Sequence, residues 1–230
     1  MTIHRVEQGS PEWHALRCGK ATGSRVASIC RKVKSGGYSA DRANYLAELV
    51  LERLTGRAAE TYVSRDMEIG TLREPDARVE YELRHRCEVE QIGFVDHPTI
   101  AMSGASTDGF IGDDGLLEIK CPIPATHLSY LRAGVVPSEY LPQIMWNFAC
   151  NPTRQWCDFC SFHPDFPEPM VLFTVRVLRD DDKISFYEGH VAQFLKDVDE
   201  EVANLRAVYI ERRNLAAEQL QASVNLLEAS

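Results

Sequence analysis

The stretch from Ser106 to Pro122, STDGFIGDDGLLEIKCP, constrains the fold of this chain more than any other. Its central glycines predict a tight turn between two strands. Because side chains two apart in a strand share a face, Glu118 and Lys120 would point the same way, while the residue between them points into the core. The turn would also bring Asp108 back beside Glu118. The stretch therefore predicts a hairpin that gathers two carboxylates and a lysine.

These side chains suit metal-assisted hydrolysis of a phosphodiester. Clustered carboxylates repel each other unless a cation neutralises them, and their hard oxygen atoms are ligands that Mg²⁺ prefers. Asp108 and Glu118 would hold the metal, with the backbone carbonyl of Ile119 as an additional oxygen ligand. Lys120 would orient or deprotonate the attacking water, or stabilise the transition state as a cation. The spacing D-x₉-E-x-K is not specific by itself, because a chain with 34 acidic residues produces such matches by chance.

Length and composition favour one globular domain. The chain has 230 residues, of which 44% are hydrophobic and 26% are charged, and this suffices for one substantial core. We expect a single domain over residues 1–230, with a helical part at about 1–86 packed on a sheet core and a helical tail at about 183–230.

The compartment is predicted from apolar runs and cysteines. No run has the length of a signal peptide or a membrane span, so we expect a cytoplasmic protein without a membrane partner. The seven cysteines are odd in number and lack the spacing of a secreted scaffold. Reduced thiols without a structural disulfide are therefore expected.

The net charge of −9 argues against a nucleic-acid partner until its distribution is considered. Residues 1–60 carry a net charge of +4, and residues 61–230 carry −13. A DNA-facing surface should therefore draw on the N-terminal quarter, including the basic loop RKVKSGG at residues 31–37, and on bound metal ions.

The N-terminal region also predicts a site for an anion. Ser10-Pro11 favours the start of a short helix, on which Trp13 and Arg17 share a face. Thr22-Gly23-Ser24 then opens a second helix, whose free amides and hydroxyls can bind an anion. Together with Arg17 they would form a phosphate pocket. A plain helix cap is the alternative for the same three residues.

Helix and strand patterns alternate along the rest of the chain. Helices are expected over residues 39–55, 64–86, 122–134 and 138–148 and in the tail, and strands over residues 89–95, 99–103, 116–120, 155–162 and 169–178. Pro75 should kink the second of these helices and re-aim Glu74. The helical spacing of the first assigns Leu54 to the core, and in the tail an apolar stripe is expected at Phe186, Val191, Phe194, Leu195 and Val198.

Five ordered blocks resemble the phage lambda exonuclease family of recombination nucleases, which belongs to the wider PD-(D/E)xK superfamily. The blocks are EQGSPEWHALRCGKATGS, LAELVLERLTG, the E-P-x-A-R-x-x-Y-E run of Glu74–Glu82, STDG with LEIKCP, and YLPQIMW. Their order along nearly the whole chain is far more specific than any single block. The resemblance implies a mixed α/β (α+β) fold with a central mixed β-sheet flanked by helices, of the restriction-endonuclease-like kind.

Carried over position by position, the resemblance implies roles for residues around the hairpin. Asp108 and Glu118 would be metal ligands, and Lys120 the catalytic lysine. Glu74 would be a further acid that reaches the metal through water, and Gln143 would lie beside the site.

The resemblance also implies contacts to DNA. The residues that would hold the terminal 5′-phosphate are Arg17, Ser24 and Ser106. A basic loop residue, Lys34, with Arg31 near it, would contact the duplex, and Met67 would help to separate the strands. One departure is Thr107, where many superfamily members have proline, and this should affect the turn rather than the chemistry.

The implied activity is digestion of the 5′-ended strand of linear double-stranded DNA, leaving a 3′ single-stranded tail. The resemblance implies two Mg²⁺ ions, for which Mn²⁺ can substitute, a ring-shaped homotrimer around the DNA, and a recombinase partner that anneals the exposed strand. It also implies a phage or prophage protein that works in the cytoplasm of a bacterial host. A ring would explain the acidic net charge, because an encircling protein stays on DNA without a strongly basic surface.

Alternatives remain open at this point. A related nuclease of different polarity or with endonucleolytic action would share the same core residues, and a DNA-end-binding protein without catalysis would use the acids only as caps. Cys157 and Cys160 raise the alternative of an iron–sulfur cluster. Residues three apart on a strand face opposite sides, however, so these two thiols are expected to be buried small hydrophobes.

Overall fold

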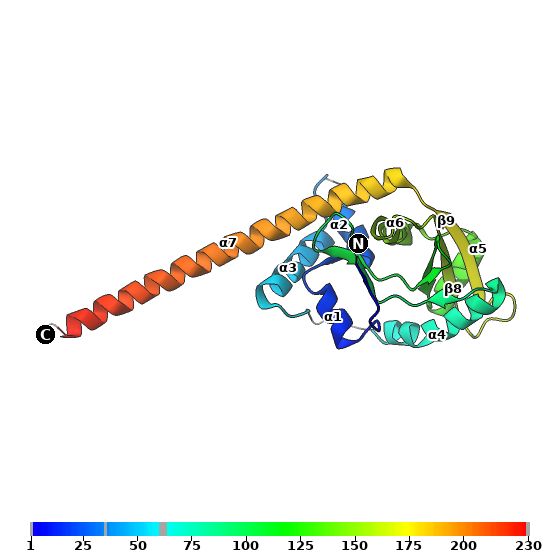
Figure 1. The fold of residues 1–230 in the computed structure, drawn as a ribbon, viewed down its shortest axis with the longest axis horizontal. Helices are drawn as coiled ribbons and strands as arrows, with labels where there is room; N and C mark the ends of the chain where they lie inside the picture. Colours follow the sequence, from blue (N-terminus) through cyan, green and yellow to red (C-terminus); the bar gives the residue numbers. More distant parts are fainter. Residues whose placement is uncertain (1, 35, 60–63, 229–230) are drawn as a thin grey trace.

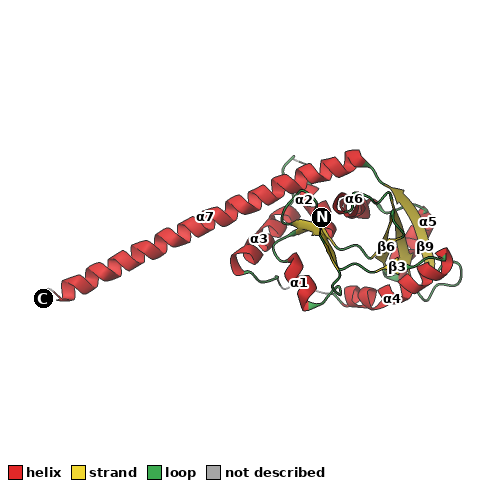
Figure 2. Ribbon diagram, viewed as in Figure 1, coloured by secondary structure: helices red, strands yellow, loops and turns green. Residues whose placement is uncertain are grey.

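The computed structural model describes residues 2–34, 36–59 and 64–228 as a mixed α+β fold with two mixed sheets flanked by helices (Figures 1 and 2). The helices are α1 Pro11–Arg17, α2 Val26–Cys30, α3 Ala40–Thr55, α4 Arg65–His85, α5 Pro124–Ala133, α6 Leu141–Cys150 and α7 Asp181–Glu228, with 3₁₀ turns η1 Gly23–Arg25 and η2 Ser138–Tyr140. None of these described helices has the length and apolar character needed to span a membrane.

The larger sheet has five strands in the order β3-β6-β7-β8-β9. Its strands are β3 Val89–Glu90, β6 Gly109–Ile111, β7 Gly115–Lys120, β8 Trp156–Phe162 and β9 Leu172–Leu178. Strand β7 pairs parallel with β8, and the other pairs are antiparallel. The smaller sheet has the order β1-β4-β5-β2 and comprises β1 Ile3–His4, β2 Ala21–Thr22, β4 Phe94–Asp96 and β5 Ser103–Ala105.

Both faces of the larger sheet are covered, which explains the continuous apolar run of β7. Leu116 packs into one hydrophobic cluster with Trp146 and other residues of α6. Leu117 and Ile119 pack into a second cluster with Tyr81 of α4. The prediction that two cysteines of β8 face opposite sides of the sheet is confirmed, since Cys157 belongs to the first cluster and Cys160 to the second.

Local sequence signals set most helix ends. The hydroxyl of Ser10 accepts a hydrogen bond from the Trp13 amide at the start of α1, and Ser64 does the same for the amide of Met67 at the start of α4. Gly56 ends α3 in the left-handed conformation that glycine favours. Helix α4 continues through Pro75 from Arg65 to His85.

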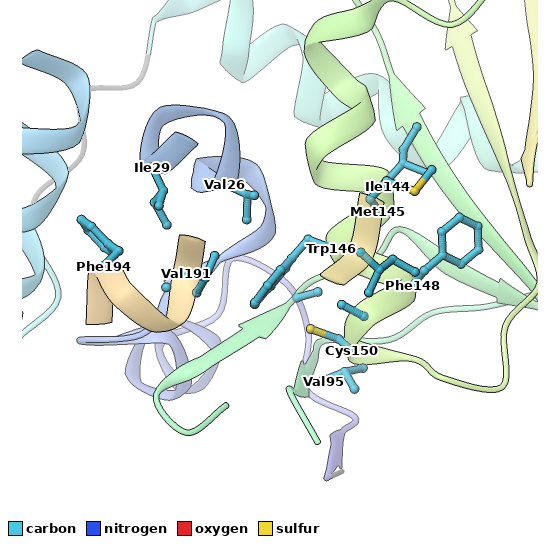
Figure 3. Packing of buried hydrophobic residues seen from close by; sticks show 14 of the residues in the cluster. Val26, Ile29, Val95, Ile144, Met145, Trp146, Phe148, Cys150, Val191 and Phe194 are labelled. Carbon is cyan, nitrogen blue, oxygen red and sulfur yellow. The ribbon is translucent and has the colours of Figure 1, made fainter. Parts of the chain in front are cut away.

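Helix α7 divides into a packed and a projecting part. Figure 3 shows Val191 and Phe194 of α7 beside Ile29 of α2, in the cluster that also contains Trp146. Beyond about residue 205 the helix extends away from the body of the molecule (Figure 1). There the described apolar side chains that are exposed are Val208, Tyr209, Ile210 and Leu215.

Three expectations about elements were wrong. The strand expected over residues 89–95 is two strands, β3 and β4, which belong to different sheets. Residues 99–102 form a turn, and the strand begins only at Ser103. Phe186 and Leu54, both assigned to apolar stripes, are exposed because each lies on the outer side of its helix.

Candidate active site

The hairpin of β6 and β7 carries Asp108 back beside the middle of β7. Gly112, with a φ of 52°, allows the tight turn between the two strands. The amide of Asp108 donates to the carbonyl of Leu117 at 3.2 Å, and its carboxylate Oδ2 accepts from the amide of Ile119 at 2.5 Å. Thr107 is fully buried and donates its hydroxyl to the Leu117 carbonyl at 3.1 Å.

Glu118 is the most enclosed acid of the site, with no exposed surface. One carboxylate oxygen accepts from Lys120 Nζ at 2.5 Å, as expected for two residues on one face of a strand. The other oxygen accepts from Nδ2 of Asn147, on α6, at 3.0 Å. Both oxygens of this buried carboxylate are therefore hydrogen-bonded, which is what burial of a charge requires.

Glu74 is electrostatically coupled to the hairpin from α4. Burial and the nearby charge of Asp108 raise the pKa of Glu74 to about 7, although Lys120 and Arg78 oppose the shift. Burial also raises the pKa of Asp108, and burial together with the Asp108 charge raises that of Glu118 to about 7. Three carboxyl groups thus influence one another in a poorly solvated place.

Lys120 remains an ammonium in this setting. Burial alone would lower its pKa, but the charges of Glu118 and Asp108 outweigh burial and raise it. The Nζ atom also lies 5.3 Å from the centre of the Tyr140 ring, within cation–π range.

The acids fit a hard divalent cation by their chemistry and their mutual repulsion. In the described part of the chain, no three side chains of His, Cys, Asp or Glu already converge as a ready-made metal cluster. Lys120 binds one oxygen of Glu118, and the Ile119 amide binds Asp108. The residues that would hold the metal are Asp108, Glu118, Glu74 and the Ile119 carbonyl, and all four roles stay predictions.

The residues expected at a terminal phosphate lie on neighbouring elements. Arg17 stacks on the Trp13 ring at 3.9 Å and donates to Ser106 Oγ at 3.0 Å. Trp13 Nε1 donates to the same hydroxyl at 2.9 Å. Strands β2 and β5 pair in parallel, with Thr22 opposite Gly104. Ser24 lies two residues after Thr22 and Ser106 two residues after Gly104, so both serines lie at the same end of this strand pair.

The remaining predicted residues are less closely grouped. Gln143 on α6 is close to Gly23, where a Cβ atom would lie 3.7 Å from Gln143 Cγ. Arg31 pairs with Asp41 at 2.6 Å, and Lys34 is exposed in the loop next to Ser35, which lies outside the described residues. Met67 is 53% exposed on the first turn of α4. No described hydrogen bond or ion pair joins any of these four residues to the carboxylates of the hairpin or to Glu74, and their roles stay predictions.

Two polar residues near the carboxylates were not anticipated. Asn147 lies one helical turn after Gln143, and Arg78 lies one turn after Glu74, in a position to affect the pKa of both Glu74 and Asp108. The sequence signals for them are the i, i+4 spacing from a predicted site residue and, for Arg78, its place in the E-P-x-A-R-x-x-Y-E run.

Comparisons with known proteins give a consistent result. The YqaJ-like viral recombinase domain family matches residues 12–154, which include every predicted site residue. The alkaline exonuclease LHK-Exo from Laribacter hongkongensis is 40% identical, with a TM-score of 0.82 over 88% of this chain and 99% of that chain. A second crystal structure, of LHK-Exo in complex with dAMP, matches with the same values.

A phage-related exonuclease from Haemophilus somnus 129PT is 15% identical, with a TM-score of 0.62 over 81% of this chain and 96% of that chain. At this identity the likeness concerns the fold alone. No curated protein sequence matches the chain significantly.

Proposed function

This chain belongs to the YqaJ-like viral recombinase family of lambda-exonuclease-like proteins and is a nuclease of recombination, and we propose that it is a Mg²⁺-dependent exonuclease for double-stranded DNA. It digests the 5′-ended strand and leaves a 3′ single-stranded tail. The fold is that of PD-(D/E)xK-type phage exonucleases.

One observation carries the proposal. A single hairpin presents Asp108, Glu118 and Lys120 together, with Glu118 fully buried and bonded to Lys120 at 2.5 Å. Purely structural acids would cap turns at the surface, whereas here Glu118 is fully buried and Asp108 half-buried, and the charge of Lys120 acts on both. Placing acidic groups close together away from solvent costs free energy, and such an arrangement is typical of an active site.

A bound Mg²⁺ would polarise the phosphate and lower the pKa of an attacking water. The carboxylates of Asp108, Glu118 and Glu74 would hold this Mg²⁺ ion in place. Of the three roles that the sequence left open for Lys120, which are to orient the water, to deprotonate it or to stabilise the transition state as a cation, the proposal takes the last, because Glu118 and Asp108 raise the pKa of the lysine.

Recognition of the DNA end is assigned to the N-terminal quarter. The guanidinium of Arg17, held flat on Trp13 and bonded to Ser106, offers further N–H donors to a terminal 5′-phosphate. Ser24 is exposed on η1 and adds a hydroxyl. The position of these residues beside the hairpin supports attack on the first phosphodiester of the 5′-ended strand.

The test is release of acid-soluble nucleotides from linear duplex DNA with 5′-phosphates. We expect release with Mg²⁺ and none with a chelator, while the chelated protein still binds the duplex. Binding without metal-dependent release would identify an end-binding protein and contradict the proposal.

The proposal extends to assembly and partners. A homotrimeric ring in the cytoplasm of a bacterial host would keep this acidic protein on DNA, and a single-strand annealing recombinase would take up the 3′ tail. Sedimentation equilibrium measures the first point, and a trimer mass is expected. A monomer at all concentrations would contradict the ring.

A further inference from the structure

Asn147 is a buried residue of α6 with one satisfied and one unsatisfied polar atom. Its side chain has no exposed surface. The Nδ2 atom donates to Glu118 Oε2 at 3.0 Å, whereas none of the described residues donates a hydrogen bond to the buried Oδ1. An unpaired buried carbonyl costs about 1–3 kcal/mol, and the hydrogen bond to the Glu118 carboxylate is what offsets this cost.

The orientation of the amide is determined by its neighbour. In its ionised form, in which it accepts from Lys120, the Glu118 carboxylate only accepts hydrogen bonds, so it faces the NH₂ group and not the oxygen of Asn147. Reversing the amide would place two acceptors against each other. The free Oδ1 consequently points away from Glu118, toward Gly23, where a Cβ atom would lie only 3.3 Å from it.

The helix that carries Asn147 is held firmly. The Asn151 side chain donates to the backbone carbonyl of Asn147 at 2.8 Å. The neighbouring Trp146 donates to the carbonyl of Gly104 in β5 at 3.0 Å and stacks on His97 at a centroid distance of 5.0 Å. Asn147 therefore lies on a helix that is fixed by its contacts, and not in a mobile loop.

We propose that Asn147 is a positioning residue that fixes the carboxylate of Glu118 for metal binding, an inference that rests on the proposed metal-dependent function. Lys120 and Asn147 hold the two oxygens of Glu118 from different elements, β7 and α6. If a cation were bound at the oxygen that Lys120 now contacts, Asn147 would keep the other oxygen in place and so limit rotation of the carboxylate.

The unpaired Oδ1 of Asn147 lies close to a second part of the site. It is next to Gly23, the first residue of the turn η1 that carries Ser24. Asn147 thus lies between the metal-binding carboxylate and the turn assigned to the terminal phosphate. The absence of a Cβ atom at Gly23 leaves room for this arrangement.

The experiment measures Mn²⁺ binding by calorimetry, without DNA, for the wild type, Asn147→Leu and Asn151→Leu. Partners that orient a metal ligand typically contribute about 10- to 100-fold to metal affinity, so we expect a loss of that size in Asn147→Leu. Asn151→Leu is the matched control: it removes a buried asparagine, 2% exposed, that bonds the backbone carbonyl of Asn147 but not Glu118, while Trp146 still holds the helix through the carbonyl of Gly104. Its Mn²⁺ affinity should equal that of the wild type.

An equal Mn²⁺ affinity in Asn147→Leu and the wild type would overturn the inference, and so would an equal loss in both variants, since that would reflect the stability of α6. Should Asn147→Leu not fold, Asn147→Ser, whose side chain is too short to reach Glu118, is measured in the same way. Duplex binding in chelator should be unchanged by the substitution. A wild type that binds Mn²⁺ but releases no nucleotides would count against the proposed function and leave the role of Asn147 intact.

Discussion

Single residues of the site show how burial is balanced against charge. Glu118 has no exposed surface, yet each of its oxygens has a donor, one from Lys120 and one from Asn147. Removing one donor from a buried carboxylate leaves an uncompensated charge, which is costly. The site residues are therefore best tested by substitutions that keep the side-chain shape.

Glu118→Gln and Lys120→Met should lower the rate of nucleotide release by about 100- to 10,000-fold, since each removes a charge that acts on the phosphate or the metal. Binding to duplex ends in chelator should stay close to the wild type in both variants, whereas the melting temperature should fall in Lys120→Met, which leaves the buried Glu118 carboxylate without its cation. Steady-state release from linear duplex measures the effect. A wild-type rate in either variant would refute the assigned site.

Arg17→Ala should reduce the preference for 5′-phosphorylated over 5′-hydroxyl ends. A charge-assisted hydrogen bond contributes about 1.5–3 kcal/mol, which corresponds to roughly a 10- to 100-fold change in that ratio. The ratio of initial rates on the two substrates is the measurement. Arg5→Ala, which removes an exposed arginine paired with Glu90, is the control. An unchanged ratio in Arg17→Ala would show that the phosphate pocket lies elsewhere.

Sequence reasoning anticipates contacts that depend on local geometry. The pairing of Glu118 with Lys120 follows from the two-residue period of a strand, and the stacking of Arg17 on Trp13 follows from the four-residue spacing of a helix. Asn147 could not be anticipated, because its approach to Glu118 depends on how α6 packs across the sheet. That packing is a property of the whole core and not of any segment.

At the scale of elements, the main error concerned residues 89–95, expected as one strand. Their composition suits a strand, but Gly93 interrupts it where the chain passes close to the N-terminal segment: a Cβ atom at Gly93 would lie 2.3 Å from the carbonyl of Val6. The two short strands on either side join different sheets. Where a distant segment comes close to the backbone of a strand, the only sign of it in the sequence is an isolated glycine.

His97 connects three elements and should make stability depend on pH. Its Nδ1 accepts from the amides of Thr99 and Ile100, its Nε2 pairs with Glu188 of α7 at 3.1 Å, and its ring stacks on Trp146 of α6. Burial lowers the pKa of His97 despite the opposing charge of Glu188. Protonation would place a hydrogen on Nδ1, against two amide donors.

Because the folded pKa lies below the unfolded value of about 6.5, this histidine contributes stability above that pH, and the contribution is lost as the pH falls below it. His97→Asn keeps an acceptor for the two amides and cannot be protonated. Its unfolding free energy should therefore decrease less between pH 7.5 and 5.5 than that of the wild type, by up to about 1.4 kcal/mol per pH unit. Chemical denaturation at several pH values measures both slopes, and equal slopes would contradict the prediction. Three further histidines with lowered pKa remain in both proteins: His127, His163 and His190.

At the scale of the whole molecule, α7 is both a part of the core and an arm. Among the α7 side chains whose burial is described, Val202 is the last buried one, and the exposed apolar residues described beyond it contribute little to the fold. Deleting residues 211–230 should therefore shift the melting temperature of the dilute protein by less than about 2 °C. Differential scanning fluorimetry is sufficient. A larger fall would show that the arm is packed in solution.

The fold as a whole was anticipated by the resemblance of five ordered blocks and not by periodicity. The net charge of the whole chain is also misleading by itself, because the chain is acidic in total although its N-terminal quarter, which carries Arg17 and Ser24, is basic. The order in which strands join sheets, β3-β6-β7-β8-β9, depends on contacts between distant segments. Only relatives with the same core give access to such information from sequence.

The most direct test of the account follows each end of one strand during digestion. A linear duplex with 5′-phosphates is labelled at either the 5′ or the 3′ end of the same strand and incubated with Mg²⁺ or with chelator. The account predicts that the 5′ label is released first, as a mononucleotide, that the 3′ label stays in a shortening strand, and that chelator stops both. Release of the 3′ label first, or cleavage of a circular duplex under the same conditions, would contradict it.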